Sequence, residues 1–182
     1  MESKLTALYG IGPKLAKQYM RDGINGQKLD MAKPIRAQLK KKKIFPHLPA
    51  ATKADLRWRP SRHIPRATIV KIDAEFKKRL PGIRHQIAGS YRRKKPYSRD
   101  VDLIISAPGS KTTAEHWKRF LLRMKESSMV KFVEVFAQGD DKVSTILRFQ
   151  DKRGSKRTFV KVDVFFTDPK EYMYMLLYAT GS

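Results

Sequence analysis

Residues 99–105 of the chain read RDVDLII. Side chains alternate between the two faces of a β-strand, so Asp100 and Asp102 would project from one face with their Cα atoms about 6.6 Å apart. The other face would be apolar and buried, and it would consist of Val101, Leu103 and Ile105. The stretch therefore predicts a strand with one core face and one acidic face.

A second apolar stretch supplies a third carboxylate. Residues 159–166 read FVKVDVFF, and in a strand the side chain of Asp163 would oppose the apolar face formed by Val160, Val162, Val164 and Phe166. Three acids at one sheet surface would raise each other's pKa unless a cation neutralised them. Oxygen ligands without His or Cys suit Mg²⁺, and two such ions can activate a hydroxyl and stabilise a leaving pyrophosphate oxygen. A D-x-D pattern without this context is usually a solvated strand face.

A glycine-containing turn lies shortly before these acids. Residues 89–93 read GSYRR and follow the apolar Ile87 and Ala88, which resemble the end of a strand. Glycine lets a backbone approach phosphate closely, and amides at a helix start favour anions. The Ser90 hydroxyl can donate a hydrogen bond, and Arg93 can contact phosphate with two nitrogens. Next to the acidic strand, this turn predicts a triphosphate cradle.

Hydrophobic periodicity divides the chain into two parts. Up to residue 66 we expect a small all-helical domain of short helices, with Leu5, Leu8, Leu15 and Tyr19 at helical spacing around a Gly-Pro break at 10–13. Over 67–182 we expect a mixed β-sheet with flanking helices, which makes the fold class α+β. The predicted strands are 101–105, 130–137, 143–149 and 159–166, and the predicted helices are 112–125 and 169–178.

Two of these helices have start signals. Thr112 and Glu115 have the spacing of a capping box, and the helix that follows has an apolar stripe of Trp117, Phe120, Leu121 and Met124 that we assign to the core. Asp168 followed by Pro169 is typical of an N-cap and a first helical residue.

The charge balance predicts a polyanionic partner. Lys and Arg number 40 against 17 Asp and Glu, which leaves a net charge of +23, and residues 1–87 carry 21 of the basic and 6 of the acidic side chains. Such a surface attracts phosphate backbones and releases their counterions. The basic run at 40–43 is typical of a solvated face or a localisation patch. No cysteine is present for disulfides, and no apolar run approaches the roughly 18 residues of a membrane span. We therefore expect no membrane partner.

Five motifs in order resemble the nucleotidyltransferase superfamily, and more narrowly the X family of DNA polymerases of the DNA polymerase beta type. They are GIGPK at 10–14, HIPR at 63–66, GSYRR at 89–93 with DVD at 100–102, VDV at 162–164, and YATGS at 178–182. The resemblance implies a helical fingers domain with a helix-hairpin-helix, followed by a nucleotidyltransferase palm. It also implies that the family's lyase and thumb domains lie outside this chain, so that a partner or a further segment would supply the thumb.

The resemblance assigns roles to individual residues. Asp100 and Asp102 would bind two Mg²⁺ ions, for which Mn²⁺ can substitute, and Asp163 would bind the catalytic one. The incoming dNTP would contact Gly89, Ser90, Arg93, Ser98, Arg99, Tyr178, Ala179 and Gly181. Gapped or double-stranded DNA would contact Gly10, Ile11, Gly12, Lys14 and Arg66, and the carbonyls of Thr6, Leu8 and Ile11 would hold a monovalent cation, K⁺ or Na⁺.

Three positions depart from the family pattern. Ala179 replaces an aromatic residue beside the nucleotide sugar, which puts strict exclusion of ribonucleotides in doubt. His63 replaces an arginine, so that a triphosphate contact there would be weaker or pH-dependent, and Arg99 replaces a glycine. The expected function is gap filling in base excision repair, together with other repair proteins. Untemplated transfer and DNA binding without catalysis are the alternatives. The expected compartment is intracellular and contains DNA: the nucleus, with the mitochondrion and a viral particle as alternatives.

Overall fold

The computed structural model describes residues 2–30, 32–109 and 111–181, which form two compact units divided between Arg59 and Pro60. The division falls before the boundary at residue 66 that the sequence suggested. Residues 60–65 belong to the second unit because Ile64–Pro65 (β1) pairs with Tyr97–Ser98 (β3), and because the Ser61 amide donates to the Phe159 carbonyl at 2.8 Å.

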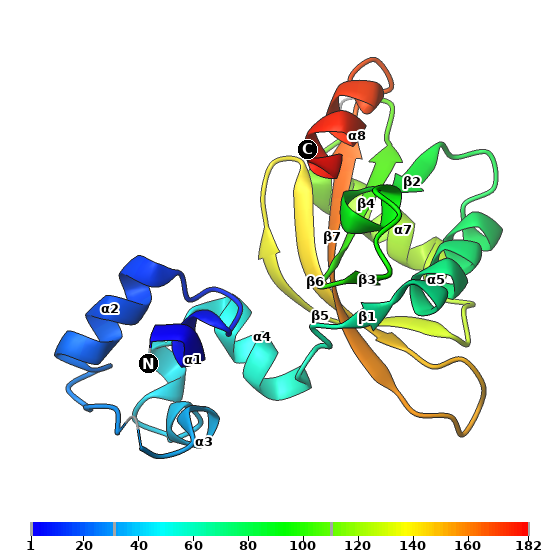
Figure 1. Ribbon diagram of the computed structural model, residues 1–182. Coiled ribbons are helices and arrows are strands. Elements are labelled where there is room, and N and C mark those ends of the chain that lie inside the picture. The colour runs from blue at the N-terminus through cyan, green and yellow to red at the C-terminus, as the bar shows by residue number, and fades with distance from the viewer. Residues whose placement is uncertain (1, 31, 110, 182) are drawn as a thin grey trace. The chain divides into compact units, whose positions relative to one another are not determined.

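The N-terminal unit is all-helical, as predicted. Its elements are α1 (Glu2–Thr6), α2 (Pro13–Asp22), α3 (Ile35–Leu39), the 3₁₀ helix η1 (Phe45–His47) and α4 (Ala50–Trp58) (Figure 1). Pro13 occupies the first position of α2, where its missing N–H costs nothing. Leu5, Leu8 and Tyr19 are buried in one apolar core, against which Leu15 packs partly exposed.

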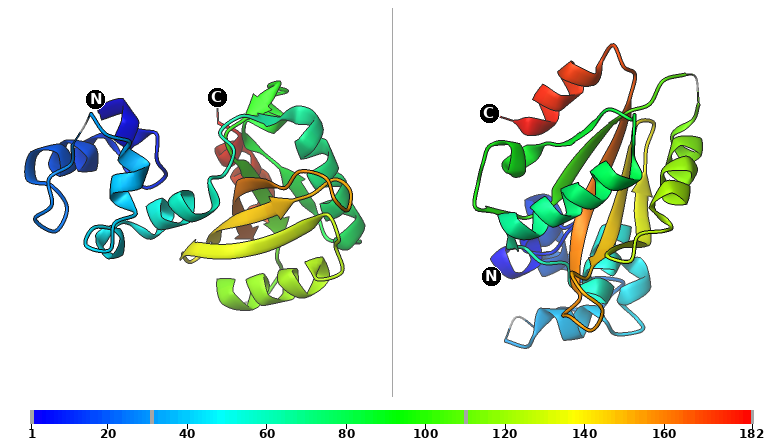
Figure 2. Two further views of the ribbon diagram at one scale, coloured as in Figure 1. Left: turned by 90° about the horizontal axis from the view of Figure 1, so that it is seen from below. Right: turned by 90° about the vertical axis from the view of Figure 1, so that its right-hand side faces the viewer.

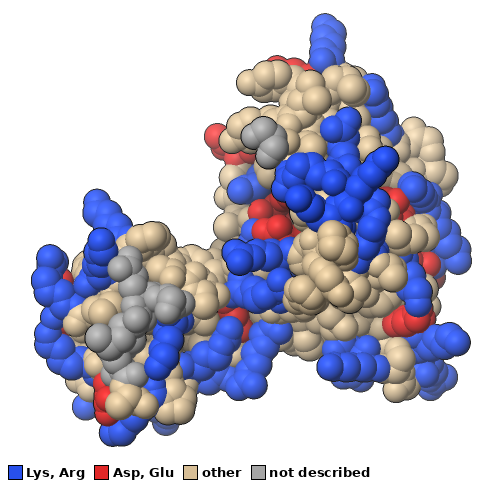
Figure 3. All heavy atoms as spheres, viewed as in Figure 1, with Lys and Arg blue, Asp and Glu red and all other residues tan. Residues whose placement is uncertain are grey.

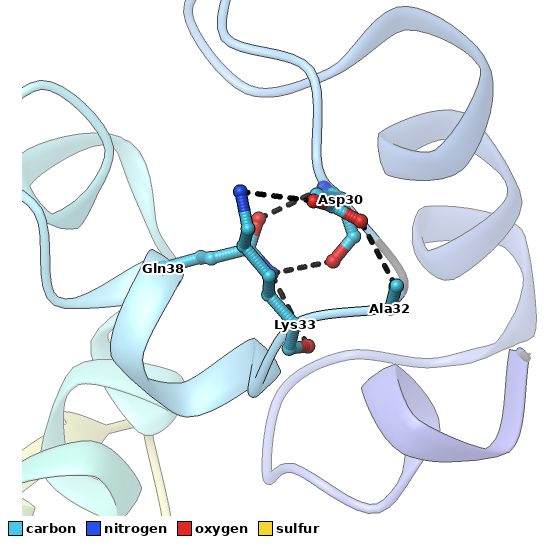
Figure 4. Close-up of polar contacts among 4 residues, drawn as sticks. All are labelled: Asp30, Ala32, Lys33 and Gln38. Carbon is cyan, nitrogen blue, oxygen red and sulfur yellow. Dashed lines mark hydrogen bonds and ion pairs between the residues drawn. The ribbon is translucent and has the colours of Figure 1, made fainter.

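A side-chain clamp fastens the loop before α3 (Figure 4). The side chain of Gln38, 6% exposed, accepts from the Asp30 amide at 2.8 Å and donates to the Asp30 carbonyl at 2.7 Å. The Asp30 carboxylate accepts from the Ala32 amide and pairs with Lys33 at 3.2 Å. The clamp satisfies the buried amide of Gln38, so we assign it a structural role.

The C-terminal unit contains the predicted mixed sheet. Its five strands have the order β2-β4-β7-β6-β5, in which β4 and β7 are parallel and the other pairs are antiparallel. The bounds are β2 (His85–Ile87), β4 (Val101–Ser106), β5 (Val130–Gln138), β6 (Lys142–Phe149) and β7 (Thr158–Thr167). The four predicted strands are thus present. The strands β1, β2 and β3 are too short to show a clear alternation of apolar and polar residues in the sequence.

Helices cover both faces of the sheet. α7 (Thr113–Met124) and α8 (Tyr172–Thr180) lie on opposite sides of it in the right-hand view of Figure 2. α5 (Arg66–Arg79) packs with α7, and the core between these helices and the sheet contains the predicted apolar faces: Val101, Leu103, Ile105, Val160, Val162, Val164 and Phe166. On the other face Ile104 is fully buried beneath Tyr172 and Leu176 of α8. This second face is the one that carries the predicted acids.

The helix starts differ in how well they were predicted. The capping box of α7 is present: the Glu115 amide donates to Thr112 Oγ1 at 3.3 Å, and the Thr112 amide donates to Glu115 Oε2 at 2.8 Å. The predicted start of the last helix at Asp168-Pro169 was wrong, because α8 begins at Tyr172. The Asp168 side chain accepts from the Lys170 amide at 2.8 Å, so it closes a turn instead of capping a helix.

In the described part of the chain, no helix has the length and apolarity to cross a membrane.

Candidate active site

Strand pairing brings the predicted carboxylates together. Asp102 of β4 and Asp163 of β7 are direct register partners in the parallel pair. Asp100 lies one residue before β4, on the same face as Asp102. Three acids that are separated in the sequence therefore meet at one place on the α8 face of the sheet.

Two side chains that the sequence did not single out hold Asp163. Its Oδ2 lies 2.8 Å from Lys161 Nζ, and its Oδ1 accepts a hydrogen bond from Ser144 Oγ at 2.6 Å. The same ammonium group lies 3.5 Å from Asp100 Oδ2. Lys161 is two residues before Asp163, so strand alternation places it on this face, whereas Ser144 arrives through its register pairing from β6.

The remaining acid, Asp102, has a raised pKa. Burial, and then the negative charges of Asp100 and Asp163, raise its pKa from 3.8 to about 7, although Lys161 and Lys142 oppose the shift. Burial disfavours the charged form of an acid, and like charges disfavour it further. Near neutral pH Asp102 is therefore only partly ionised, and a bound cation would favour its charged form.

This donor set fits a divalent cation. Carboxylate oxygens without His or Cys are the ligands of hard ions such as Mg²⁺, and a divalent ion would relieve the repulsion that raises the Asp102 pKa. However, among residues 2–30, 32–109 and 111–181, no group of three or more His, Cys, Asp or Glu side chains is arranged to hold a metal ion. The Lys161 ammonium group contacts two of the three carboxylates, and metal binding by these acids stays a prediction.

The glycine of the predicted phosphate cradle lies directly against Asp102. Gly89 begins the short helix α6 (Gly89–Arg92) with φ +58°, and a Cβ atom at this position would lie 2.5 Å from Asp102 Oδ2. Both the backbone conformation and the space thus require glycine. The hydroxyl of Ser90 donates to Ser98 Oγ at 2.6 Å, so these two predicted nucleotide-binding residues contact each other.

These residues line a cavity of about 490 Å³. Its walls are basic at Arg62, Arg93 and Arg99 and acidic at Asp100 and Asp102. Figure 3 shows Lys and Arg side chains clustered beside acidic ones on this face of the C-terminal unit. The rings of His63 and Tyr97 stack at 3.6 Å and form another part of the wall. The cavity therefore combines arginine side chains, which suit a polyphosphate, with carboxylates, which suit the metal ions that accompany a polyphosphate.

The end of α8 forms one wall of the cavity. Tyr178, Ala179, Thr180 and Gly181 all line it, and the ring of Tyr178 is 72% exposed. Thr180 is buried, and its hydroxyl donates to the Leu176 carbonyl at 2.6 Å. The predicted nucleotide-binding residues of both motifs, from 89–99 and from 178–181, are thus gathered around one cavity.

Arg66, predicted to contact DNA, makes internal contacts. Its Nη1 donates to the Tyr91 carbonyl at 2.6 Å, and the guanidinium carbon lies 4.3 Å from the centre of the Tyr91 ring. These contacts fasten α6 to the start of α5. DNA binding by Arg66 stays a prediction.

In the N-terminal unit, α4 holds the predicted hairpin between α1 and α2. The Tyr9 amide donates to Asp55 Oδ2 at 2.8 Å, and Thr52 Oγ1 donates to the Tyr9 carbonyl at 2.7 Å. Asp55 is fully buried and also pairs with Arg36 at 2.9 Å. The following residue, Gly10, has φ +80° and contacts α4 so closely that a Cβ would lie 3.0 Å from Ala51 Cβ. Sequence inspection did not identify Asp55, because a single helical Asp has no distinguishing pattern.

The other predicted residues of the hairpin are placed as follows. Gly12 is the N-cap of α2, and the exposed Lys14 lies in the first turn of that helix. The Ile11 amide donates to the Leu8 carbonyl at 3.3 Å. The cation-binding role of the Thr6, Leu8 and Ile11 carbonyls stays a prediction, as does the helix-hairpin-helix itself.

The C-terminal unit matches a known protein family. A family model described as DNA polymerase beta palm matches residues 63–169. The matched range contains the three carboxylates, Lys161, Ser144 and the GSYRR turn, whereas the hairpin and residues 178–181 lie outside it.

Proposed function

Because the chain belongs to the DNA polymerase beta palm family and is thus a polymerase-beta-like nucleotidyltransferase, we propose that it is a DNA-directed DNA polymerase that fills short gaps. The observation that carries the proposal is the register pairing of Asp102 with Asp163, with Gly89 packed against Asp102 at the wall of a basic cavity. The arrangement supports the proposal because a polyphosphate bound in the cavity would lie beside these acids.

The chain's own side chains would position both substrates. Arg93, Arg62 and Ser90 would bind the triphosphate, since guanidinium and hydroxyl groups donate to phosphate oxygens. Asp100, Asp102 and Asp163 would hold Mg²⁺, which supplies charge neutralisation at the reacting phosphate. Loading requires Lys161 to release Asp100 and Asp163.

The bond changes follow from this placement. The primer 3′-oxygen forms a bond to the α-phosphorus, the bond from that phosphorus to the bridging oxygen breaks, and pyrophosphate leaves with the bonding electrons. Asp163 would accept the proton of the primer hydroxyl. Because no covalent intermediate is needed, catalysis would come mainly from positioning and charge stabilisation.

The N-terminal unit would bind the DNA. It carries 14 Lys and Arg against 4 Asp and Glu over residues 1–59, and its predicted hairpin presents backbone amides at the start of α2, where a phosphate is favoured. We assign the activity to base excision repair in an intracellular, DNA-containing compartment, the nucleus. A monovalent cation at the Thr6, Leu8 and Ile11 carbonyls belongs to the same proposal.

Insertion of one nucleotide into a gapped duplex tests the proposal. The chain would be compared in Mg²⁺ with Asp163→Ala and with Asp141→Ala, which removes an exposed acid outside the site, and each of the four dNTPs and rNTPs would be offered singly. We expect only the nucleotide that matches the template to be inserted, and a loss of at least about 10³-fold in Asp163→Ala.

Three other results would change the proposed function. Insertion without regard to the template would make the protein an untemplated nucleotidyltransferase. Use of rNTPs as readily as dNTPs would assign a role to Ala179, whose small side chain lines the cavity. Salt-sensitive DNA binding without any insertion would indicate a binding module.

A further inference from the structure

A second cavity lies on the other face of the sheet from the carboxylates. It measures about 220 Å³ and opens between the end of α5, the end of β4 and α7. Its apolar wall contains Leu80, Ile105, Phe120 and Phe166, all of which belong to the main core. Protein cores are close-packed, with few voids larger than a water molecule, so an opening of this size into the core can receive an apolar group.

The mouth of this cavity is basic. Arg119 and Arg123, one turn apart on α7, line it together with His116, whose ring stacks on Phe166 at 5.6 Å. In the described part of the chain neither guanidinium group forms an ion pair with a carboxylate, and Glu115, four residues before Arg119, is bound to the Thr112 cap. An anionic group at the mouth would thus meet two guanidinium groups that no ion pair engages.

The apolar surface continues outside the cavity. Leu122, between the two arginines in sequence, is 62% exposed, and these three residues border a further surface hollow. A small ligand would fill the cavity and leave Leu122 uncovered, whereas a peptide segment could cover both. A nucleic acid would pair its phosphates with the arginines, but a base paired within a duplex would not enter the cavity.

We propose that the cavity between α5, β4 and α7 is a docking site for a segment of a partner protein in which a large apolar side chain is flanked by carboxylates. The apolar side chain enters the cavity, and the carboxylates bind Arg119 and Arg123. Apolar burial would provide most of the affinity, and the charge pairs would orient the segment. The site is independent of the proposed polymerase activity, since it lies on the opposite face of the sheet from Asp102.

The test uses a fluorescein-labelled peptide with one phenylalanine between pairs of glutamates, and follows its anisotropy with the full chain. Arg123→Gln should weaken binding about fivefold by removing a charge-assisted contact. Lys118→Gln, which removes the same charge from α7 away from the cavity, should change binding less than about twofold, as expected of an exposed charge. Ala107→Leu, which fills the cavity, should weaken binding about tenfold through lost apolar contact.

A second readout locates the peptide. Partial burial, Lys111 and Arg119 lower the pKa of His116, so carboxylates bound at the mouth should raise it, as followed by the NMR signals of that ring. Equal weakening by Lys118→Gln and Arg123→Gln, or equal binding of a peptide with glycine in place of phenylalanine, would overturn the proposal. Complete displacement of the peptide by a single-stranded oligonucleotide would overturn it in favour of a nucleic-acid surface.

Discussion

Replacing Asp102 with Asn should stabilise the metal-free protein. The pKa of this acid is about 7 in the folded chain and 3.8 in its ordinary environment. The difference of about three in pKa corresponds to a ceiling of roughly 4 kcal/mol for the cost of ionising Asp102 in the fold. Relaxation around the charge reduces this cost, so we expect Asp102→Asn to raise the free energy of unfolding by about 2 kcal/mol at pH 8.

The difference in stability between Asp102→Asn and the wild type should increase with pH. Between pH 4 and 7 the folded state retains a proton that the unfolded state has lost, so the stability of the wild type falls relative to Asp102→Asn as the pH rises. The difference should be near zero at pH 4, should grow up to about pH 7, and should then level off.

Denaturant unfolding with EDTA measures this difference. Trp117 is buried in the C-terminal unit, so its fluorescence in a Trp58→Phe background follows the unit that contains the site. At an m-value of about 2 kcal/mol per molar urea, the expected gain shifts the midpoint by about 1 M. Asp141→Asn controls for the loss of an exposed charge. The reasoning would be refuted by a difference that stays constant between pH 4 and 8, or by a less stable variant at pH 8.

Three other substitutions test the remaining contacts. Gly89→Ala should reduce nucleotide insertion at least about 100-fold, because the added Cβ displaces Asp102. Gly139→Ala, where a Cβ has room, is the control. A fully active Gly89→Ala variant would contradict the role proposed for the contact between Gly89 and Asp102. Asp55→Ala should destabilise the N-terminal unit by about 2 kcal/mol and weaken DNA binding, since it leaves an arginine and a backbone amide without their partner; unchanged urea unfolding would disprove the stabilising role of the Asp55 contacts. Lys161→Ala should tighten Mg²⁺ binding measured by calorimetry, because no ammonium group competes for the carboxylates; weaker Mg²⁺ binding would mean that the lysine helps to assemble the site.

The sequence alone determined the features that depend on local periodicity. Strand alternation put Val101 and Leu103 in the core and the acids on the opposite face, and the Thr112 capping box located the start of α7. These predictions held because each depends on residues within a few positions of one another. The same alternation predicted that Asp100, Asp102 and Asp163 face away from the core, before any strand pairing was known.

Only the tertiary structure decided which side chains from different strands and helices meet. Ser144 reaches Asp163 through the register of β6 with β7, and Asp55 reaches the hairpin because α4 packs against it. The same holds for the raised pKa of Asp102, which arises from burial and from neighbours brought close by pairing. Burial and charge–charge interactions depend on distance in space, and the spacing of residues along the chain does not specify that distance.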